Sequence, residues 1–416
     1  MRRALWGGRL RWIAASLLLL VFALAAMLLP LPRQEGGLRV GSAASVAAEE
    51  EGEGSEAEGV EKLHDAIGEL ISSLDWKELQ DYLDSLSELK GISVKDKLQS
   101  VITGDFSLDY SSVFQAVLGL VWDEIQVLFP SFAVILAVTI LCGVLNSSKN
   151  GFLHSTMSNI IDFVAYLAVG AVTLSALMSV LQVGFEAMER MKKQMDLIYP
   201  ILLTLMAGSG GAVSAAIFRP AVAFFSSGIA SLFSSFVMPV AVVVIVIGFV
   251  GNLTKEYQTE KLGGLLKSAS KWVIGLTLGL FTLFLSVQGI SAAQYDGLSL
   301  RAAKYALSSS VPIVGGFLSG GADLVLAGSA LIKNALGSFS IFLLFATVLR
   351  PVLLFAAFQL FLRLAAAATE PVGGNISPFL SRLAADTGYF IAALLAVAFL
   401  YFLTLLLLVC ASGVIL

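Results

Sequence analysis

Residue types that carry enzyme chemistry are scarce in this chain of 416 residues, which contains two cysteines and two histidines. Cys142 and Cys410 lie inside apolar runs, while His64 and His154 lie in unrelated segments. Neither pair has the spacing of a metal site or a catalytic dyad. No phosphate-binding loop, nucleophile elbow or paired carboxylate motif occurs either. The sequence therefore predicts a protein that is not an enzyme and has no catalytic, cofactor-binding or metal-binding residues.

Two clusters of small residues interrupt apolar runs, namely Ser209, Gly210, Gly211 and Ser319, Gly320, Gly321. Small residues allow helices to pack closely in a membrane, and they also permit broken helices that line a cavity. Both interpretations stay open, so the two clusters are candidate packing or pore motifs.

Three charged residues, Arg219, Asp323 and Arg350, lie within or beside apolar runs. Charge in a bilayer core is costly and usually faces the protein interior. We expect Asp323 to pair with Arg350 or Arg219 and to fix helix packing, and a buried pair without a transport role is the simpler interpretation. Three other aspartates are expected near helix ends, where interfacial water solvates them: Asp162, Asp196 and Asp386.

Four sequence markers recur in the same order at spacings of 110 to 112 residues: Pro200 and Pro312, Ser209 and Ser319, Pro239 and Pro351, Gly263 and Gly373. This pattern predicts an internal repeat of residues 197–290 and 309–411. With 38 glycines in the chain, chance matching is the alternative. Repeats with interrupted helices are typical of transporters and channels.

The elements that must position these residues are apolar helices. Hydrophobic residues make up 57% of the chain and charged residues 13%, about half the roughly 25% usual in soluble domains. This composition excludes an ordinary cytosolic enzyme, a nucleic-acid-binding protein and a disordered chain. Net charge is +5 over residues 1–47, −14 over 48–125 and +5 over 126–416. The acidic charge therefore belongs to one polar block that precedes the apolar part.

The N-terminal 125 residues divide into two parts. Residues 1–47 combine four early arginines, the apolar run 12–29 and small residues at 42–48, which predicts a signal peptide; an uncleaved anchor is the alternative. Residues 48–125 are predicted to form an acidic extracytoplasmic helical region. A second helix is expected after Asp75, a third near Ser93, and a fourth is expected to lead into the membrane. Their apolar faces either pack together or dock a partner.

Residues 126–416 form the predicted multi-span membrane domain. Apolar runs long enough to cross a bilayer lie at 127–146, 158–182, 197–218, 220–253, 272–293, 311–334, 338–363 and 389–413. Since Pro239 either kinks or splits the longest run, the sequence predicts seven to nine spans. The amphipathic segments 183–196 and 255–271 are expected at the membrane surface or against partners, and four lysines favour a cytoplasmic place for the second. The fold class is therefore an all-α polytopic membrane protein.

Longer motifs in this block resemble the stage III sporulation protein AE family of endospore-forming bacteria. The resemblance rests on Ser209-Gly-Gly-Ala-Val-Ser-Ala-Ala216, on Ser286-Val-Gln-Gly-Ile-Ser-Ala-Ala293 with Leu300-Arg-Ala-Ala-Lys304, and on Val311-Pro-Ile-Val-Gly315. It covers residues 100–411 and includes the order of signal peptide, acidic helical region and multi-span block.

The resemblance implies a membrane subunit of a channel or secretion-like complex in the mother-cell membrane around the forespore. Such a complex supports forespore development and late sigma-factor activity. The implied partners are other stage III sporulation membrane proteins, a channel partner on the forespore side and the lipid bilayer, with no nucleic acid; self-association is left open. The family offers no catalytic residues to carry over. A small-molecule or ion transporter is the alternative, and a scaffold is the third hypothesis.

Overall fold

The computed structural model describes residues 66–85, 93–103, 110–147, 155–253, 261–284, 315–372 and 376–410. These residues are helical apart from short turns, and none of them forms a strand. This confirms the all-α prediction for the described part of the chain. The predicted signal peptide and the acidic linker that follows it lie outside the described residues.

The chain forms two compact units, of which the first comprises residues 1–75 and 303–329. Within it, helix 66–73 packs against the first part of α13, which extends over Gly315–Thr369. A Cβ atom at Gly328 would lie 3.0 Å from Leu70 Cδ1, so the absence of a side chain permits this close approach. Ile67 and Ile71 are buried.

The second unit, residues 76–302 and 330–416, begins with two short helices. Helix α4 spans Lys77–Ser85 and α5 spans Val94–Thr103. Ser93 Oγ accepts a hydrogen bond from the Asp96 amide at 3.3 Å, which caps α5, and Gln80 Oε1 accepts one from the Val94 amide at 2.9 Å, which ties α5 to α4. The helices expected after Asp75 and near Ser93 are therefore present.

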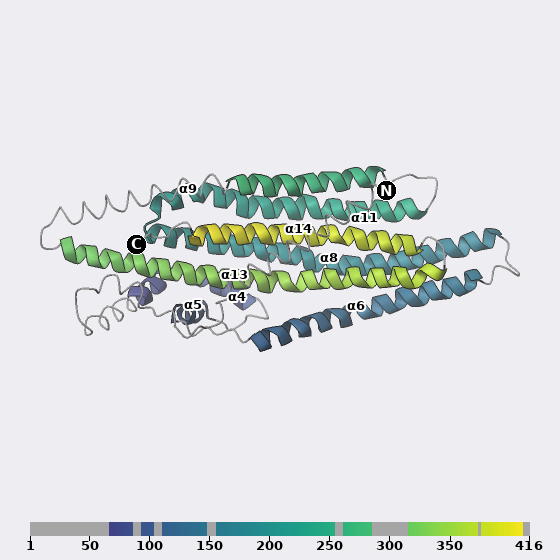
Figure 1. Ribbon diagram of the computed structural model, residues 1–416, viewed down its shortest axis with the longest axis horizontal. Coiled ribbons are helices and arrows are strands. Elements are labelled where there is room, and N and C mark those ends of the chain that lie inside the picture. The colour runs from purple at the N-terminus through teal and green to yellow at the C-terminus, as the bar shows by residue number, and fades with distance from the viewer. Residues whose placement is uncertain are drawn as a thin grey trace. The chain divides into compact units, whose positions relative to one another are not determined.

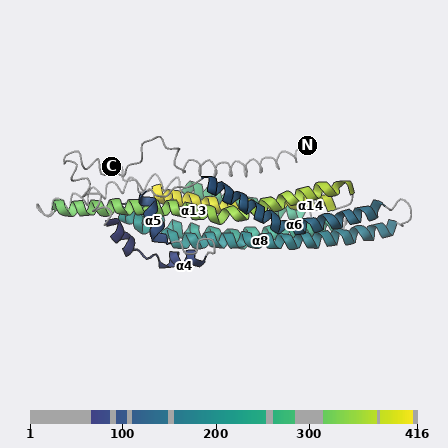
Figure 2. The same ribbon diagram turned by 90° about the horizontal axis from the view of Figure 1, so that it is seen from below.

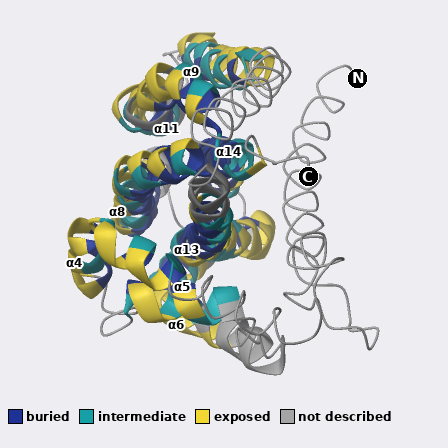
Figure 3. Ribbon diagram, turned by 90° about the vertical axis from the view of Figure 1, so that its left-hand side faces the viewer, coloured by how far each residue is buried: buried dark blue, intermediate teal, exposed yellow. Residues whose placement is uncertain are grey.

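Long helices make up the rest of the second unit (Figure 1). Helix α6 spans Tyr110–Ser147, α8 spans Ser155–Gly208, and α14 spans Ile376–Cys410. Helix α8 lies against both α6 and α14, and α14 also contacts α11, Met238–Leu253. In the most apolar stretch of each helix, 67% of the residues of α14 are buried, compared with 22% of those of α6. Helix α14 is therefore central, and α6 lies at the edge (Figure 3).

Helices α8 and α13 are much longer than a single membrane span. They contain 54 and 55 residues, or about 80 Å each at 1.5 Å per residue, against roughly 30 Å of bilayer hydrocarbon. The runs 158–182 and 197–218 were expected as separate spans. The first lies on α8, and the second begins on α8 and continues into the helix that follows it. The run 338–363 lies on α13, as do residues 315–334 of the run 311–334.

The segment 183–196 explains why α8 does not break. Its apolar face is buried in the second unit through Met188, Met191 and Met195, while Glu186 and Glu189 are exposed. The predicted amphipathic helix thus continues the flanking helices instead of lying flat at a surface. In the described residues, five helical stretches are long and apolar enough to cross a membrane: 122–141, 163–208, 230–251, 324–369 and 376–410. The expected seven to nine spans are not confirmed.

Residues 212–253 form one helical run interrupted by two π-helical turns. It consists of α9 (Ala212–Ala223), η1 (Phe224–Ile229), α10 (Ala230–Leu232), η2 (Phe233–Val237) and α11. The chain stays helical through Pro239. This proline lacks an amide donor, but it is the second residue after the π turn η2, where the regular i to i−4 bonding pattern already changes. Residues 261–284 are also helical.

Candidate functional site

A layer of polar side chains crosses the helices of the second unit. At its centre is Gln194 of α8, which is fully buried. Its Nε2 donates to Tyr82 Oη of α4 at 3.2 Å and to Thr347 Oγ1 of α13 at 2.8 Å. One amide therefore joins three helices, including one from the N-terminal region. Figure 2 shows α4 alongside α8.

Tyr82 attaches α4 to the charged face of α8. Its hydroxyl donates to the Arg190 carbonyl at 3.5 Å, and Lys193 Nζ lies 5.3 Å from the centre of its ring. Burial raises the pKa of Tyr82 above its ordinary value, while the bond to Gln194 and the charge of Arg190 act in the opposite direction. The phenol therefore stays neutral and keeps donating under physiological conditions.

The polar layer continues to α6 through an ion pair. Arg350 lies three residues after Thr347 on α13, and its Nε donates to Glu124 Oε1 at 2.8 Å. The Glu124 side chain is only 5% exposed, whereas that of Arg350 is 49% exposed. We define the polar layer as Tyr82, Gln194, Thr347, Arg350 and Glu124.

The side chains of the polar layer connect helices through hydrogen bonds and an ion pair. The layer contains no thiol, no imidazole and no second carboxylate beside Glu124 in these five residues. Among the described residues, Gln194 Oε1 is buried with no hydrogen-bond partner, so the layer keeps one unused acceptor. These contacts join α4 and α13 to α8, and α6 to α13.

The first predicted motif, Ser209 to Gly211, ends α8. The Gly211 amide donates to the Met206 carbonyl at 2.9 Å and the Gly210 amide to the Ala207 carbonyl at 3.2 Å. Gly210 has a φ of 92°. This is a Schellman cap, in which the residue after the helix must adopt a left-handed conformation that favours glycine. The cluster therefore turns the chain from α8 into α9, and the two helices pack on each other.

The second predicted motif has a different backbone conformation from the first. Ser319, Gly320 and Gly321 lie inside the uninterrupted helix α13. The side chains of Ser319 and Asp323 lie outside the description, as do residues 373 and 374 of the last repeat marker. The two clusters thus share a sequence but not a conformation, and the internal repeat gains no support from them.

The predicted partner of Arg350 is wrong. Asp323 lies 27 residues earlier on the same continuous helix, a separation of about 40 Å along its axis, and Arg350 pairs with Glu124 instead. Arg219 is exposed on α9, and its pairing with Asp323 stays a prediction. Asp386 is also not near a helix end: it is the eleventh residue of α14, is buried, and forms an ion pair with Lys267.

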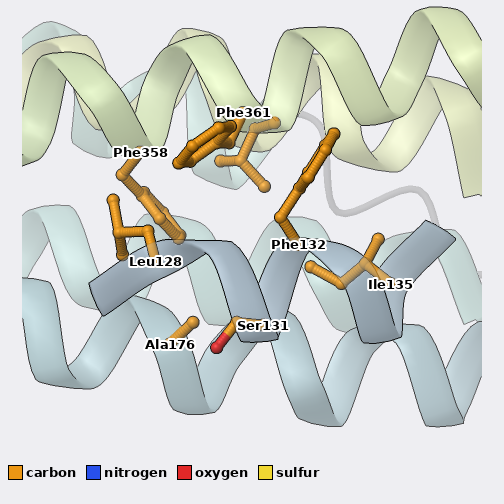
Figure 4. Close-up of a pocket in the computed structure, with 8 residues that line it drawn as sticks. Leu128, Ser131, Phe132, Ile135, Ala176, Phe358 and Phe361 are labelled. Carbon is orange, nitrogen blue, oxygen red and sulfur yellow. The ribbon is translucent and has the colours of Figure 1, made fainter. Parts of the chain in front are cut away.

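An apolar pocket lies between α6, α8 and α13 (Figure 4). Phe132 of α6 and Phe361 of α13 stack there with ring centres 4.9 Å apart. Ser131 is the one hydroxyl residue among the side chains that line it. Apolar walls of this kind suit helix packing or a lipid chain and supply no catalytic group.

Comparison with known proteins fits the helical layout. The profile of the family "Stage III sporulation protein AE" matches residues 92–413, which include every helix from α5 to α14. The chain belongs to the stage III sporulation protein AE family. The protein of that name from Bacillus subtilis (strain 168) is 28% identical over 334 residues, covering 79% of this chain and 84% of the relative. No solved structure matches the chain.

Sequence reasoning missed most of the polar layer, although it singled out Arg350. A signal for Gln194 was present, because this amide interrupts the stripe of Met188, Met191 and Met195 on the apolar face of the segment 183–196. A polar residue on a buried stripe requires a partner. Nothing in the sequence indicates that the partners are Tyr82 and Thr347, which lie 112 and 153 residues away.

Proposed function

We propose that this protein is a membrane subunit of a channel or secretion-like complex that links mother cell and forespore during endospore formation. In this role it supports forespore development and late sigma-factor activity. The protein resides in the mother-cell membrane around the forespore, with its N-terminal region outside the cytoplasm. Its partners are other stage III sporulation membrane proteins and a channel protein on the forespore side.

The observation that carries this proposal is the family match across nearly the whole helical part of the chain. The described structure is compatible with it. Long apolar helices suit a bilayer, and the polar layer fastens α4, from the acidic region, to α8 and α13. Because α4 is attached to α8 and α13, the surface that it presents outside the cytoplasm is already assembled before a partner binds.

Copurification from sporulating cells tests the proposal. A tagged copy replaces the native gene, membranes are crosslinked and solubilised during engulfment, and proteins captured with the tag are identified. We expect other stage III membrane proteins, enriched over an unrelated tagged multi-span protein from the same cells. In parallel, cells lacking the protein should complete engulfment but fail to switch on a late forespore reporter.

Normal late reporter activity in the deletion strain, or recovery of the protein without any sporulation membrane protein, would contradict the proposal. The transporter alternative makes a different prediction. The purified protein alone in lipid vesicles would then support solute-dependent flux, whereas a subunit of a larger complex should be inactive without its partners.

A further inference from the structure

Three helices of the second unit lie side by side at the end of the bundle where α13 ends and α14 begins, with α14 in the middle. On one side of α14, the Ala384 carbonyl accepts a hydrogen bond from Gln359 Nε2 of α13 at 2.8 Å. On another side, Asp386 Oδ1 lies 2.6 Å from Lys267 Nζ of helix 261–284. The surface of α14 between these two neighbours is exposed at residues 378, 381, 382 and 385.

Two arginines lie at one level on the neighbouring helices α13 and α14. A second hydrogen bond joins these helices, from Ser377 Oγ to the Ala366 carbonyl at 2.8 Å. Together with the bond from residue 359 to residue 384, it shows that the two helices are antiparallel here. Arg363 falls between the two bonds on α13, and Arg382 falls between them on α14. Both arginines are exposed.

Both arginines open onto the same face of the helix pair. Arg363 lies one turn after Gln359, and so on the side of α13 next to α14. The exposed positions of α13 here are 356, 360, 363, 364 and 367. At 100° per residue, this strip and the exposed strip of α14 are rotated from the α13–α14 contact in the same sense, each seen from the N-terminus of its own helix. For antiparallel helices, this places both strips on one side of the pair.

This part of the bundle carries an excess of positive charge. Residues 261–284, 355–369 and 376–395 contain one carboxylate, Asp386, which pairs with Lys267. Lys271 is exposed one turn further along helix 261–284, with its Nζ 5.5 Å from the ring centre of Tyr389 on α14. The same stretches contain five cations: Lys261, Lys267, Lys271, Arg363 and Arg382. Since a guanidinium has five donors, contacts within the protein leave capacity for an anion.

Exposed leucines lie beside this charge on α13. Leu360 is 56% exposed and Leu364 48%. Both belong to the stretch 324–369, which is apolar enough to cross a membrane. Leu360 lies one turn further from the end of α13 than Leu364. A cation near a helix end with apolar side chains deeper along the same strip suits a phospholipid, whose phosphate is followed by acyl chains. A soluble phosphate would make no use of the leucines.

We propose that Arg363 and Arg382 bind the headgroup phosphate of an anionic phospholipid, with an acyl chain against Leu360. Arginine holds phosphate oxygens through paired N–H groups. The nearby lysines of helix 261–284 favour a headgroup with net negative charge over a zwitterionic one. Each arginine is six residues from the end of its helix, about 9 Å, which its long side chain can reach across. This site is independent of the proposed role in sporulation.

Lipid titration tests the site in the purified full chain in a mild detergent. Phosphatidylglycerol and phosphatidylcholine with identical acyl chains are added separately, and bound lipids are counted by native mass spectrometry. Arg363→Gln and Arg382→Gln remove one charge each. Arg363→Lys and Arg382→Lys keep the charge and show whether the position tolerates substitution. Lys95→Gln, at an exposed lysine on α5, is the control for loss of a charge elsewhere.

We expect the wild type to bind phosphatidylglycerol several-fold more tightly than phosphatidylcholine. Each glutamine variant should weaken phosphatidylglycerol binding by about fivefold and leave phosphatidylcholine binding unchanged, whereas the lysine variants and Lys95→Gln should stay within about twofold of wild type. Equal binding of the two lipids by the wild type, unchanged binding in both glutamine variants, or an equal loss in Lys95→Gln would overturn the proposal. A loss in the lysine variants as large as in the glutamine variants would overturn the role of charge. Displacement of phosphatidylglycerol by an equal concentration of inorganic phosphate would overturn the assignment to a lipid.

Discussion

The ion pair between Arg350 and Glu124 predicts an asymmetric response to substitution. The Glu124 side chain is 5% exposed and that of Arg350 49%, so the two charges differ in how well water can replace the lost partner. Two unit charges about 4 Å apart attract by about 4 kcal/mol at an effective dielectric of 20, and exposure of the arginine lowers this figure. Arg350→Met should therefore cost about 2–3 kcal/mol, because it leaves a buried carboxylate without its cation.

Glu124→Gln should cost much less, about 0.5–1 kcal/mol, because the amide oxygen still accepts a hydrogen bond and the half-exposed arginine remains hydrated. The assay is the free energy of unfolding in a detergent mixture titrated with sodium dodecyl sulfate, followed by tryptophan fluorescence. Lys261→Met, at an exposed lysine at the start of helix 261–284, is the control and should stay within about 0.5 kcal/mol of wild type. Equal losses for the two partners, or a larger loss for Glu124→Gln, would refute the reasoning from burial.

Three further predictions follow from local geometry. Gly210→Ala should destabilise the protein by about 1–2 kcal/mol, because φ at this position is 92°, whereas Gly264→Ala inside helix 261–284, where a Cβ atom would meet nothing within 4 Å, should stabilise it by up to about 1 kcal/mol; chemical denaturation that ranks them the other way would contradict the two assigned conformations. Gly337→Ala should cost about 1–3 kcal/mol, since its Cβ would collide with the side chain of Val409, and adding Val409→Ala should recover part of the loss; in a double-mutant cycle, additive losses would argue against this contact. Tyr82→Phe keeps the ring but loses the hydroxyl bonds to α8, so amide hydrogen exchange in α4 should speed by roughly five- to tenfold, corresponding to about 1–1.4 kcal/mol; unchanged exchange would show that the hydroxyl does not hold α4.

Local patterns in the sequence predicted individual helices well. The Asp75 and Ser93 starts and the apolar face of the segment 183–196 all follow from short-range rules of capping and periodicity, and the structure has helices at each place. Such rules depend on neighbours within one or two turns, which the sequence contains in full.

Long-range pairing was not predictable in the same way. Glu124 and Arg350 are 226 residues apart, and Gln194 and Thr347 are 153 apart. Charge alone suggested Asp323 for Arg350, because both are isolated charges in apolar sequence. Only the continuity of α13 excludes that pair. The two Ser-Gly-Gly clusters show the same limit, since identical residues form a helix cap in one context and helix interior in the other.

The number of spans stays a prediction for a related reason. A run of 20 apolar residues has the same composition whether lipid or other helices cover it, so hydropathy counts both as spans. The helix segments that begin at the polar layer can be compared in length with a single membrane span. From Glu124 to the end of α6 is 23 residues, and from Arg350 to the end of α13 is 19, or about 35 Å and 29 Å. Both segments match one bilayer of hydrocarbon, whereas α8 and α13 are each about 80 Å long. Protein covers part of the remaining apolar length of α8, because Met188, Met191 and Met195 are buried within the second unit.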